Sequence, residues 1–345
     1  MYKISVILPI FNVENLLERA LDSIINQTMD LNDIEVIMVD DCSSDGSKKI
    51  MEKYSSKYPN FISLFHENNS GGCGFPRNTG LEVASGECVI FFDADDELLP
   101  ENCEKLYNAI KKYDADVAFG RYERVYPHLD KVEISESPFS IDLSKYYPKD
   151  KFQNIDFSKS NQADKSNEII YAKNLQKNYD LLKLAPSVWT KIFKREFLIK
   201  NDFQFQRYAA EDLVFVLNTF LKANGIVFLN NYAGYVYYKY DAADNESMTN
   251  NVSFKLLDEI CQSYIICGKL VMNFPNEVRD FYVAPQIWNW FSLWKNSNLN
   301  SDETNQLLKK LRKLKELYNN VGLKNKLRFL YIINYIKFSS ISLKD

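Results

Sequence analysis

The first 120 residues alternate between short apolar runs and amphipathic segments. Apolar runs typical of buried strands lie at 4–10, 34–39, 61–65, 88–92 and 115–120. Segments with apolar positions at helical spacing lie near 14–26, 46–57, 77–84 and 101–113. Strands that alternate with helices predict a mostly parallel sheet with right-handed crossovers.

The pattern changes beyond residue 120. A polar, Tyr- and Lys-rich stretch with scattered prolines at about 121–185 predicts loops or short helices. Order returns with Trp189 to Phe193, a helix over 211–221, two short strands near 226–229 and 233–239, and a helical region from Phe254 onward. We therefore expect three regions, 1–120, 121–250 and 251–345.

Two predicted strands end in acidic residues. The run 88–92 is followed by Asp93-Ala94-Asp95-Asp96, and the run 34–39 by Asp40-Asp41 and a stretch of turn-forming residues. Ligands of open α/β sheets bind at the carboxyl ends of the strands, so both groups are expected at one ligand-binding edge. Acids this close repel one another unless a cation neutralises them, and a hard divalent ion prefers oxygen ligands. The alternative for residues 93–96 is a solvated turn that caps the next helix.

A glycine-rich stretch, residues 69–78, ends in Arg77-Asn78. Clustered glycines let the backbone approach a flat ligand, and Arg77 offers a planar charged fork that can stack on a base or hydrogen-bond to it. An ordinary surface loop is the alternative. The stretch matches neither a Walker loop nor a G-x-G-x-x-G fingerprint, which disfavours nicotinamide chemistry.

Composition narrows the class of protein. A net charge of −4 argues against a general nucleic-acid binder. The six cysteines are dispersed without a C-x-x-C pair, which favours reduced thiols. The sequence shows neither a signal peptide nor an apolar run of about 20 residues, so we expect a cytoplasmic protein. His66 and His128 lie outside every motif and are expected to be incidental.

In order and spacing, these motifs resemble those of the family 2 glycosyltransferases. The resemblance rests on residues 3–12, 39–47, 77–80 and 92–96, and extends more weakly to Glu211-Asp212. It implies the type A nucleotide-sugar transferase fold: a Rossmann-like, nucleotide-sugar-binding α/β sheet flanked by helices, here with a C-terminal helical region. The order of elements resembles bacterial enzymes that extend lipooligosaccharide, capsule or teichoic acid glycans.

The family resemblance also implies roles for single residues. Asp95 would ligate Mn²⁺ or Mg²⁺, and Asp93 would contact the metal or the ribose. Asp41 and Arg77 would hold the uracil end of the donor. The other expected nucleotide-sugar contacts are Pro9, Phe11 and Ala94.

On the acceptor side, Asp212 matches the family's catalytic base, and Glu211 would support the acceptor or the ion. The alternative is an acidic pair that complements a helix dipole. Lys239 and the segment Ser247-Met248-Thr249 are expected to contact the diphosphate.

The expected reaction is inverting, metal-dependent transfer of a hexose or N-acetylhexosamine from a UDP-sugar to a hydroxyl of a glycan acceptor, which could be lipid-linked. Two alternatives stay open, a nucleotidyltransferase that makes sugar nucleotides and an inactive glycan-binding module. The first would carry a Gly-rich basic loop after the first strand, where Pro9-Ile10-Phe11-Asn12 stands. Intact acids at 93, 95 and 212 speak against the second.

The segment 305–345 is rich in lysine and interleaved with leucine. A basic amphipathic helix can lie on anionic lipid, which would place the protein peripherally on the inner face of the membrane. Packing of this helix on the catalytic domain is the alternative.

Overall fold

The computed structural model describes residues 1–129, 131–134, 169–175, 181–182, 187–240, 252–275, 284–317 and 323–342. They belong to two compact units. Unit 1 comprises 1–178, 187–205 and 219–240, and unit 2 comprises 179–186, 206–218 and 241–345.

The strands are β1 Ile4–Ile10, β2 Ile34–Asp40, β3 Phe61–Phe65, β4 Cys88–Phe91, β5 Glu97–Leu98, β6 Val117–Tyr126, β7 Lys131–Ile134, β8 Ile169–Ala172, β9 Lys191–Lys194 and β10 Ile226–Tyr238. The helices are α1 Leu17–Ile25, α2 Ser47–Lys57, α3 Gly74–Val83, α4 Asn102–Tyr113, α5 Arg195–Lys200, α6 Glu211–Lys222, α7 Phe254–Leu270, α9 Ala284–Lys295, α10 Ser301–Leu317 and α11 Leu323–Ser342.

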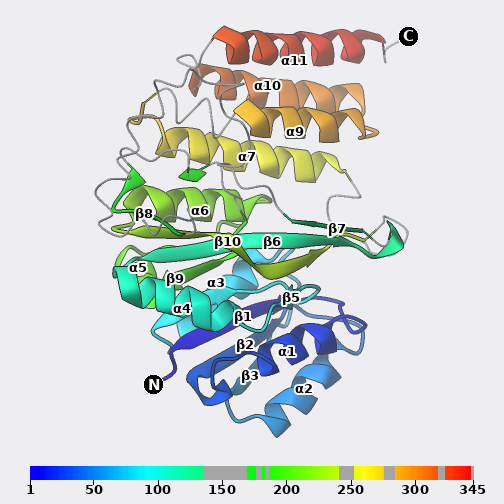
Figure 1. Cartoon of the computed structure of the whole chain (residues 1–345). Helices are drawn as coiled ribbons and strands as arrows, with labels where there is room; N and C mark the ends of the chain where they lie inside the picture. The colour runs from blue at the N-terminus through cyan, green and yellow to red at the C-terminus, as the bar shows by residue number, and fades with distance from the viewer. Residues whose placement is uncertain are drawn as a thin grey trace. The chain divides into compact units, whose positions relative to one another are not determined.

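In unit 1 the strands form one sheet in the order β3-β2-β1-β4-β9-β6-β10-β5, with β7 paired to β6 and β8 to β10. The first four strands in this order are parallel, as the alternating pattern predicts. β9 then pairs antiparallel with both β4 and β6, while β6 and β10 run parallel, side by side (Figure 1). The result is a mixed α/β sheet whose parallel part is N-terminal.

The two faces of this sheet bury different sets of residues. Alternate residues of β1, Ile4, Val6, Leu8 and Ile10, share one core cluster with residues of α1, α2 and α4. α1 contributes Leu17, Ala20, Leu21 and Ile24, the apolar stripe visible in its sequence. Helix α3 packs on β1 and β2 from the opposite face, and α5 packs on β4 and β9.

Glu35 is a buried acid on β2 that serves the fold. Its carboxylate accepts hydrogen bonds from Ser5 Oγ at 2.5 Å, Ser85 N at 2.8 Å and Ser85 Oγ at 2.7 Å. These bonds tie the segment after α3 to the first two strands. Glu35 is therefore a satisfied structural carboxylate.

Unit 2 is helical in its described residues beyond 251. α10 packs against α7 and α11, and α9 packs against α7. Leu307, Leu311 and Leu314 of α10 are buried, as are Trp290 of α9 and Leu257 of α7. These leucines of α10 thus form part of a core between C-terminal helices, and they are not exposed to lipid.

Some elements differ from the sequence-based prediction. The two short strands expected near 226–229 and 233–239 form the single strand β10, with irregular pairing to β6 between Leu229 and Tyr235. β6 continues to Tyr126, beyond the expected end at 120. Most of the predicted loop region 121–185 lies outside the described residues.

Candidate active site

The carboxyl ends of β1, β2 and β4 meet at one edge of the sheet. Ile10 pairs with Asp40, and Ile7 pairs with Phe91. Just beyond the pairing, Asp41 N donates to Ile10 O at 2.8 Å and Phe92 N donates to Ile7 O at 2.9 Å. The prediction that two strands deliver carboxylates to one edge is confirmed.

Arg77 joins this edge from the first turn of α3. Its Nη2 lies 2.7 Å from Asp93 Oδ1, and its guanidinium carbon lies 5.3 Å from the centroid of the Phe205 ring. Arg77 is only 2% exposed. A buried charged side chain needs an oppositely charged partner, and Arg77 has one in Asp93. The alternative of an ordinary surface loop is therefore wrong for Arg77.

Asp95 lies two residues after Asp93, in the loop between β4 and β5. Burial, reinforced by the neighbouring negative charge of Asp93, raises the pKa of the Asp95 carboxyl to about 6. The backbone carbonyl of Asp95 accepts a hydrogen bond from Arg19 Nη2 at 2.5 Å. Asp95 is half-buried, and the alternative of a turn that caps the next helix is not supported, because the N-cap of α4 is Glu101 and no side chain caps that helix by a hydrogen bond.

Asp96 anchors the loop to β10. Its carboxylate accepts from Tyr235 Oη at 2.6 Å and from Tyr238 N at 2.8 Å. Burial and the charges of Asp95 and Asp93 raise the pKa of Asp96 well above its ordinary value. Asp96 is 1% exposed, and both of its carboxylate oxygens are hydrogen-bonded to β10. Its role is therefore to attach the loop to this strand.

Asp93 and Asp95 suit a hard divalent cation. Both offer carboxylate oxygens, and a cation would relieve the repulsion that raises the pKa of Asp95. Within the described residues, no group of three or more His, Cys, Asp or Glu side chains could hold a metal. An ion of the Mg²⁺ class is usually held by one or two carboxylates together with substrate phosphates and water. Asp93 and Asp95 could provide the carboxylates.

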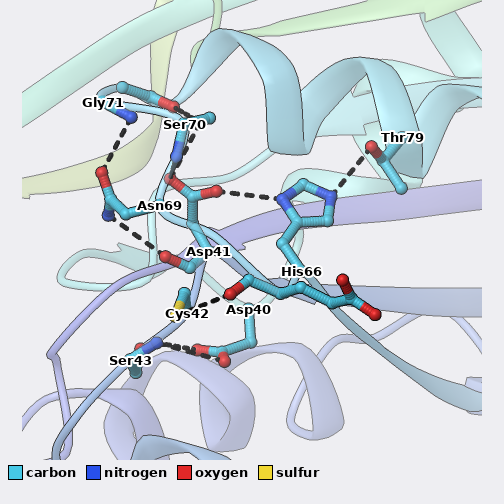
Figure 2. A network of polar contacts seen from close by, with 11 residues as sticks. Asp40, Asp41, Cys42, Ser43, His66, Asn69, Ser70, Gly71 and Thr79 are labelled. Carbon is cyan, nitrogen blue, oxygen red and sulfur yellow. Dashed lines mark hydrogen bonds and ion pairs between the residues drawn. The ribbon is translucent and has the colours of Figure 1, made fainter.

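Asp41 lies at the centre of a second polar network (Figure 2). One carboxylate oxygen is 2.9 Å from His66 Nδ1, and the other accepts from Ser70 N at 2.9 Å and Ser70 Oγ at 2.8 Å. The other nitrogen of His66 lies 3.1 Å from Thr79 Oγ1, and Asn69 Nδ2 donates to the Asp41 carbonyl at 3.1 Å. The expectation that His66 is incidental is wrong.

A sequence signal for His66 was available. The residue directly follows β3, whose carboxyl end lies at the same sheet edge as that of β2. A polar side chain at that position belongs to the ligand-binding edge by the same rule that selected Asp41.

The other expected donor contacts have different exposures. Phe11 is 48% exposed at the end of β1, whereas Pro9 is buried within the strand. Ala94 is buried in the core cluster. Their contacts with a nucleotide remain predictions.

Glu211 and Asp212 open α6 and belong to unit 2. The preceding residue, Ala210, has a left-handed backbone with φ 61°. Ala209 is held by α7, since its carbonyl accepts from Ser263 Oγ at 2.6 Å and its N–H donates to Glu259 at 3.3 Å. The structure thus shows how the backbone before this acidic pair is held, while the roles of Asp212 as base and of Glu211 at the acceptor or the ion stay predictions.

Lys239, expected to contact the diphosphate, is exposed at the end of β10. Residues 247–249 lie outside the described part of the chain. None of the described helices is both long and apolar enough to cross a membrane.

Residues 5–171 match the family model for glycosyl transferase family 2. The chain is 35% identical over 234 residues to the cholesterol galactosyltransferase of Borreliella burgdorferi, a match that spans 67% of this chain and 59% of that protein. It is 32% identical over 250 residues to the poly(ribitol-phosphate) beta-glucosyltransferase of Bacillus spizizenii, spanning 72% of this chain and 33% of that protein. The chain thus spans less than two thirds of these two relatives.

A third relative is matched over more of its length. The poly(ribitol-phosphate) beta-N-acetylglucosaminyltransferase TarP of Staphylococcus aureus is 30% identical over 268 residues, which is 75% of this chain and 71% of TarP. Among solved structures, S. aureus TarS 1–349 in complex with UDP aligns with a TM-score of 0.68 at 23% identity, over 98% of this chain and 88% of that chain. The same TarS fragment in complex with UDP-GlcNAc aligns with a TM-score of 0.67. These structures share the fold described above.

Proposed function

Because the chain belongs to glycosyl transferase family 2, we propose that it transfers a hexose or N-acetylhexosamine from a UDP-sugar to a hydroxyl group of a cell-surface glycan. The observation that carries the proposal is the ion pair of buried Arg77 with Asp93, beside Asp95, at the sheet edge where Asp41 emerges. TarP and TarS are N-acetylglucosaminyltransferases, and TarS has been crystallised with UDP-GlcNAc, which supports the donor class.

The donor would lie along this edge from its base to its diphosphate. Asp41 would accept the N–H of uracil, and Arg77, held by Asp93, would lie against the nucleoside. Asp95 and Asp93 would hold Mn²⁺ or Mg²⁺ against the diphosphate. The ion would supply positive charge that stabilises the departing UDP.

Asp212 would supply the base on the acceptor side. A single displacement, with the acceptor hydroxyl opposite the departing diphosphate, inverts the anomeric carbon and needs no enzyme nucleophile. The hydroxyl proton passes to the Asp212 carboxylate as the new C–O bond forms. Glu211 would assist by contacting the acceptor or the ion.

The acceptor would be a surface glycan of the teichoic acid or glycolipid kind, in line with the named relatives. A lipid-linked acceptor would favour contact with the membrane surface. Because the leucines at 307, 308, 311 and 314 of α10 are buried, the candidate surface for that contact is the exposed face of α11. This face includes Leu327, Leu330 and Tyr331.

A UDP-release assay tests the proposal. UDP-glucose, UDP-galactose and UDP-GlcNAc are each offered with poly(ribitol phosphate) or a sterol acceptor, with Mn²⁺ or with EDTA. We expect UDP release that depends on one donor, on an acceptor and on the metal, and a β product from an α-linked donor by its NMR coupling. Pyrophosphate formation would instead indicate a nucleotidyltransferase, and glycan binding without turnover would indicate a binding module.

Asp212→Asn tests the base because it keeps the shape and removes the basicity. We expect kcat to fall by roughly 10²–10⁴-fold with UDP affinity within a few-fold of wild type. Steady-state kinetics and calorimetry with UDP give the two quantities. Full activity of this variant would move the base to Glu211 or elsewhere, and an α product would exclude single displacement.

A further inference from the structure

We infer that His66 is a positioning residue that fixes the Asp41 carboxylate as an acceptor and thereby makes the donor site select uracil over cytosine. The inference rests on the proposed function, which places the donor base at Asp41. It adds a residue that would act through Asp41 without touching the donor.

Both side chains start from fixed backbone. His66 N donates to Asp40 O at 2.9 Å, which continues the pairing of β3 with β2. Asp41 N donates to Ile10 O at 2.8 Å and continues the pairing of β2 with β1. The contact between His66 and Asp41 in Figure 2 therefore joins two residues whose backbones are both hydrogen-bonded to a neighbouring strand.

The direction of the hydrogen bond follows from the chemistry of the partners. An ionised carboxylate can only accept, so His66 Nδ1 carries the proton that points to Asp41. In the neutral ring, Nε2 is then the acceptor for the Thr79 hydroxyl. In the charged ring both nitrogens donate, so the proton on Nδ1 is the same in either state.

These contacts leave the Asp41 carboxylate able to bind a further hydrogen-bond donor. Ser70 supplies two donors to one oxygen and His66 supplies one to the other. A carboxylate has about four lone-pair sites, so it can accept one further N–H. Uracil offers N–H at N3 and cytosine offers a lone pair there, so a fixed acceptor distinguishes the two pyrimidines.

The pair is also shielded from water. The side chain of His66 is 13% exposed and that of Asp41 is 5% exposed. The ring of Phe75 lies against His66, with centroids 4.9 Å apart. A hydrogen bond in such a site is stronger than in water. Loss of the bond from His66 should therefore disturb the Asp41 carboxylate more than loss of a solvent-exposed bond would.

Two substitutions separate the functions of the two ring nitrogens. The amide nitrogen of His66→Asn takes the place of Nδ1 and can still donate to Asp41. That of His66→Gln takes the place of Nε2 and keeps only the contact with Thr79. Calorimetry with UDP and with CDP at one Mn²⁺ concentration, together with steady-state kinetics, compares them with wild type and Asp41→Ala.

For His66→Gln we expect donor KM and the Kd of UDP to rise about tenfold, with a smaller preference for UDP over CDP. We expect acceptor KM and kcat to stay within about twofold, and His66→Asn to restore most of the UDP affinity. Equal losses in the Asn and Gln variants would overturn the inference in favour of packing against Phe75. Wild-type behaviour of His66→Gln, with UDP affinity lost in Asp41→Ala, would also overturn it. If Asp41→Ala binds UDP like wild type, the assignment of Asp41 in the proposed function fails instead.

Discussion

Asp93, Asp95 and Asp96 show how three neighbouring acids acquire different roles. Asp93 pairs with Arg77, Asp96 is bound by β10, and Asp95 is left with a raised pKa of about 6. Sequence alone identified the group and its place after a buried strand. It could not divide the roles, because the partners Arg77, Tyr235 and Tyr238 come from distant segments.

At this scale, Asp95→Ala tests the metal site. We expect transfer to be abolished and UDP affinity in Mn²⁺ to fall to the wild-type value measured in EDTA, because the diphosphate loses its counter-charge. Calorimetry with UDP in Mn²⁺ and in EDTA checks this. Near-normal turnover would remove Asp95 from the metal site.

Tyr235→Phe tests the anchoring of the loop. It deletes the donor to the buried carboxylate of Asp96, so we expect a loss of about 1.5–3 kcal/mol in the free energy of unfolding. Tyr107→Phe is the matched control, since its hydroxyl donates to the more exposed Glu87 at 2.8 Å and should cost under about 1 kcal/mol. Urea denaturation measures both, and equal costs would show that burial of Asp96 is not what matters.

Among the elements, the parallel strands and their helices could be predicted because their apolar periods are local. The start of α3 is an instructive exception. A start at 77 was expected after Pro76, whereas the helix begins at Gly74 and holds Pro76 in its first turn. Proline is tolerated there because that N–H has no intrahelical partner.

The place of β9 could not be predicted from local pattern. Residues 191–194 insert between β4 and β6, and both pairings are antiparallel. Which strands become neighbours depends on contacts across long stretches of chain. The partners of His66, Asp41 directly after β2 and Thr79 on α3, depend on the same long-range pairing, whereas the place of His66 directly after β3 was a local signal that the prediction did not use.

Packing of α3 on β1 gives a prediction at this scale. A Cβ on Gly80 would lie 2.4 Å from Cγ2 of Ile7, whereas a Cβ on Gly72 would meet nothing within 4 Å. We expect Gly80→Ala to destabilise the fold by about 1–3 kcal/mol despite the better helix propensity of alanine. Gly72→Ala should stay within about 0.5 kcal/mol. Thermal unfolding of the two variants checks this, and a stabilised Gly80→Ala would show that α3 can shift away from β1.

For the whole molecule, the distribution of exposed apolar residues bears on the membrane proposal. Leu327 and Leu330 of α11 are 57% and 39% exposed, next to exposed Lys326 and Arg328. Replacing both leucines by serine should lower binding to anionic vesicles roughly tenfold or more without changing the midpoint of unfolding. Val132→Ser, at 59% exposure on β7, is the matched control. Co-sedimentation with vesicles at low and high salt measures binding, and unchanged binding of the double variant would reject α11 as the contact surface.

The attachment of Asp96 to β10 also bears on the order of events during synthesis. Its partners Tyr235 and Tyr238 lie 139 and 142 residues further along the chain. At translation rates of about 5–20 residues per second, the ribosome needs roughly 7–30 seconds to make that stretch. β1 to β4 are complete in the nascent chain before the loop with the acids can be anchored. The parallel half of the sheet is thus available for early folding, and the proposed donor site would be complete only after β10 emerges.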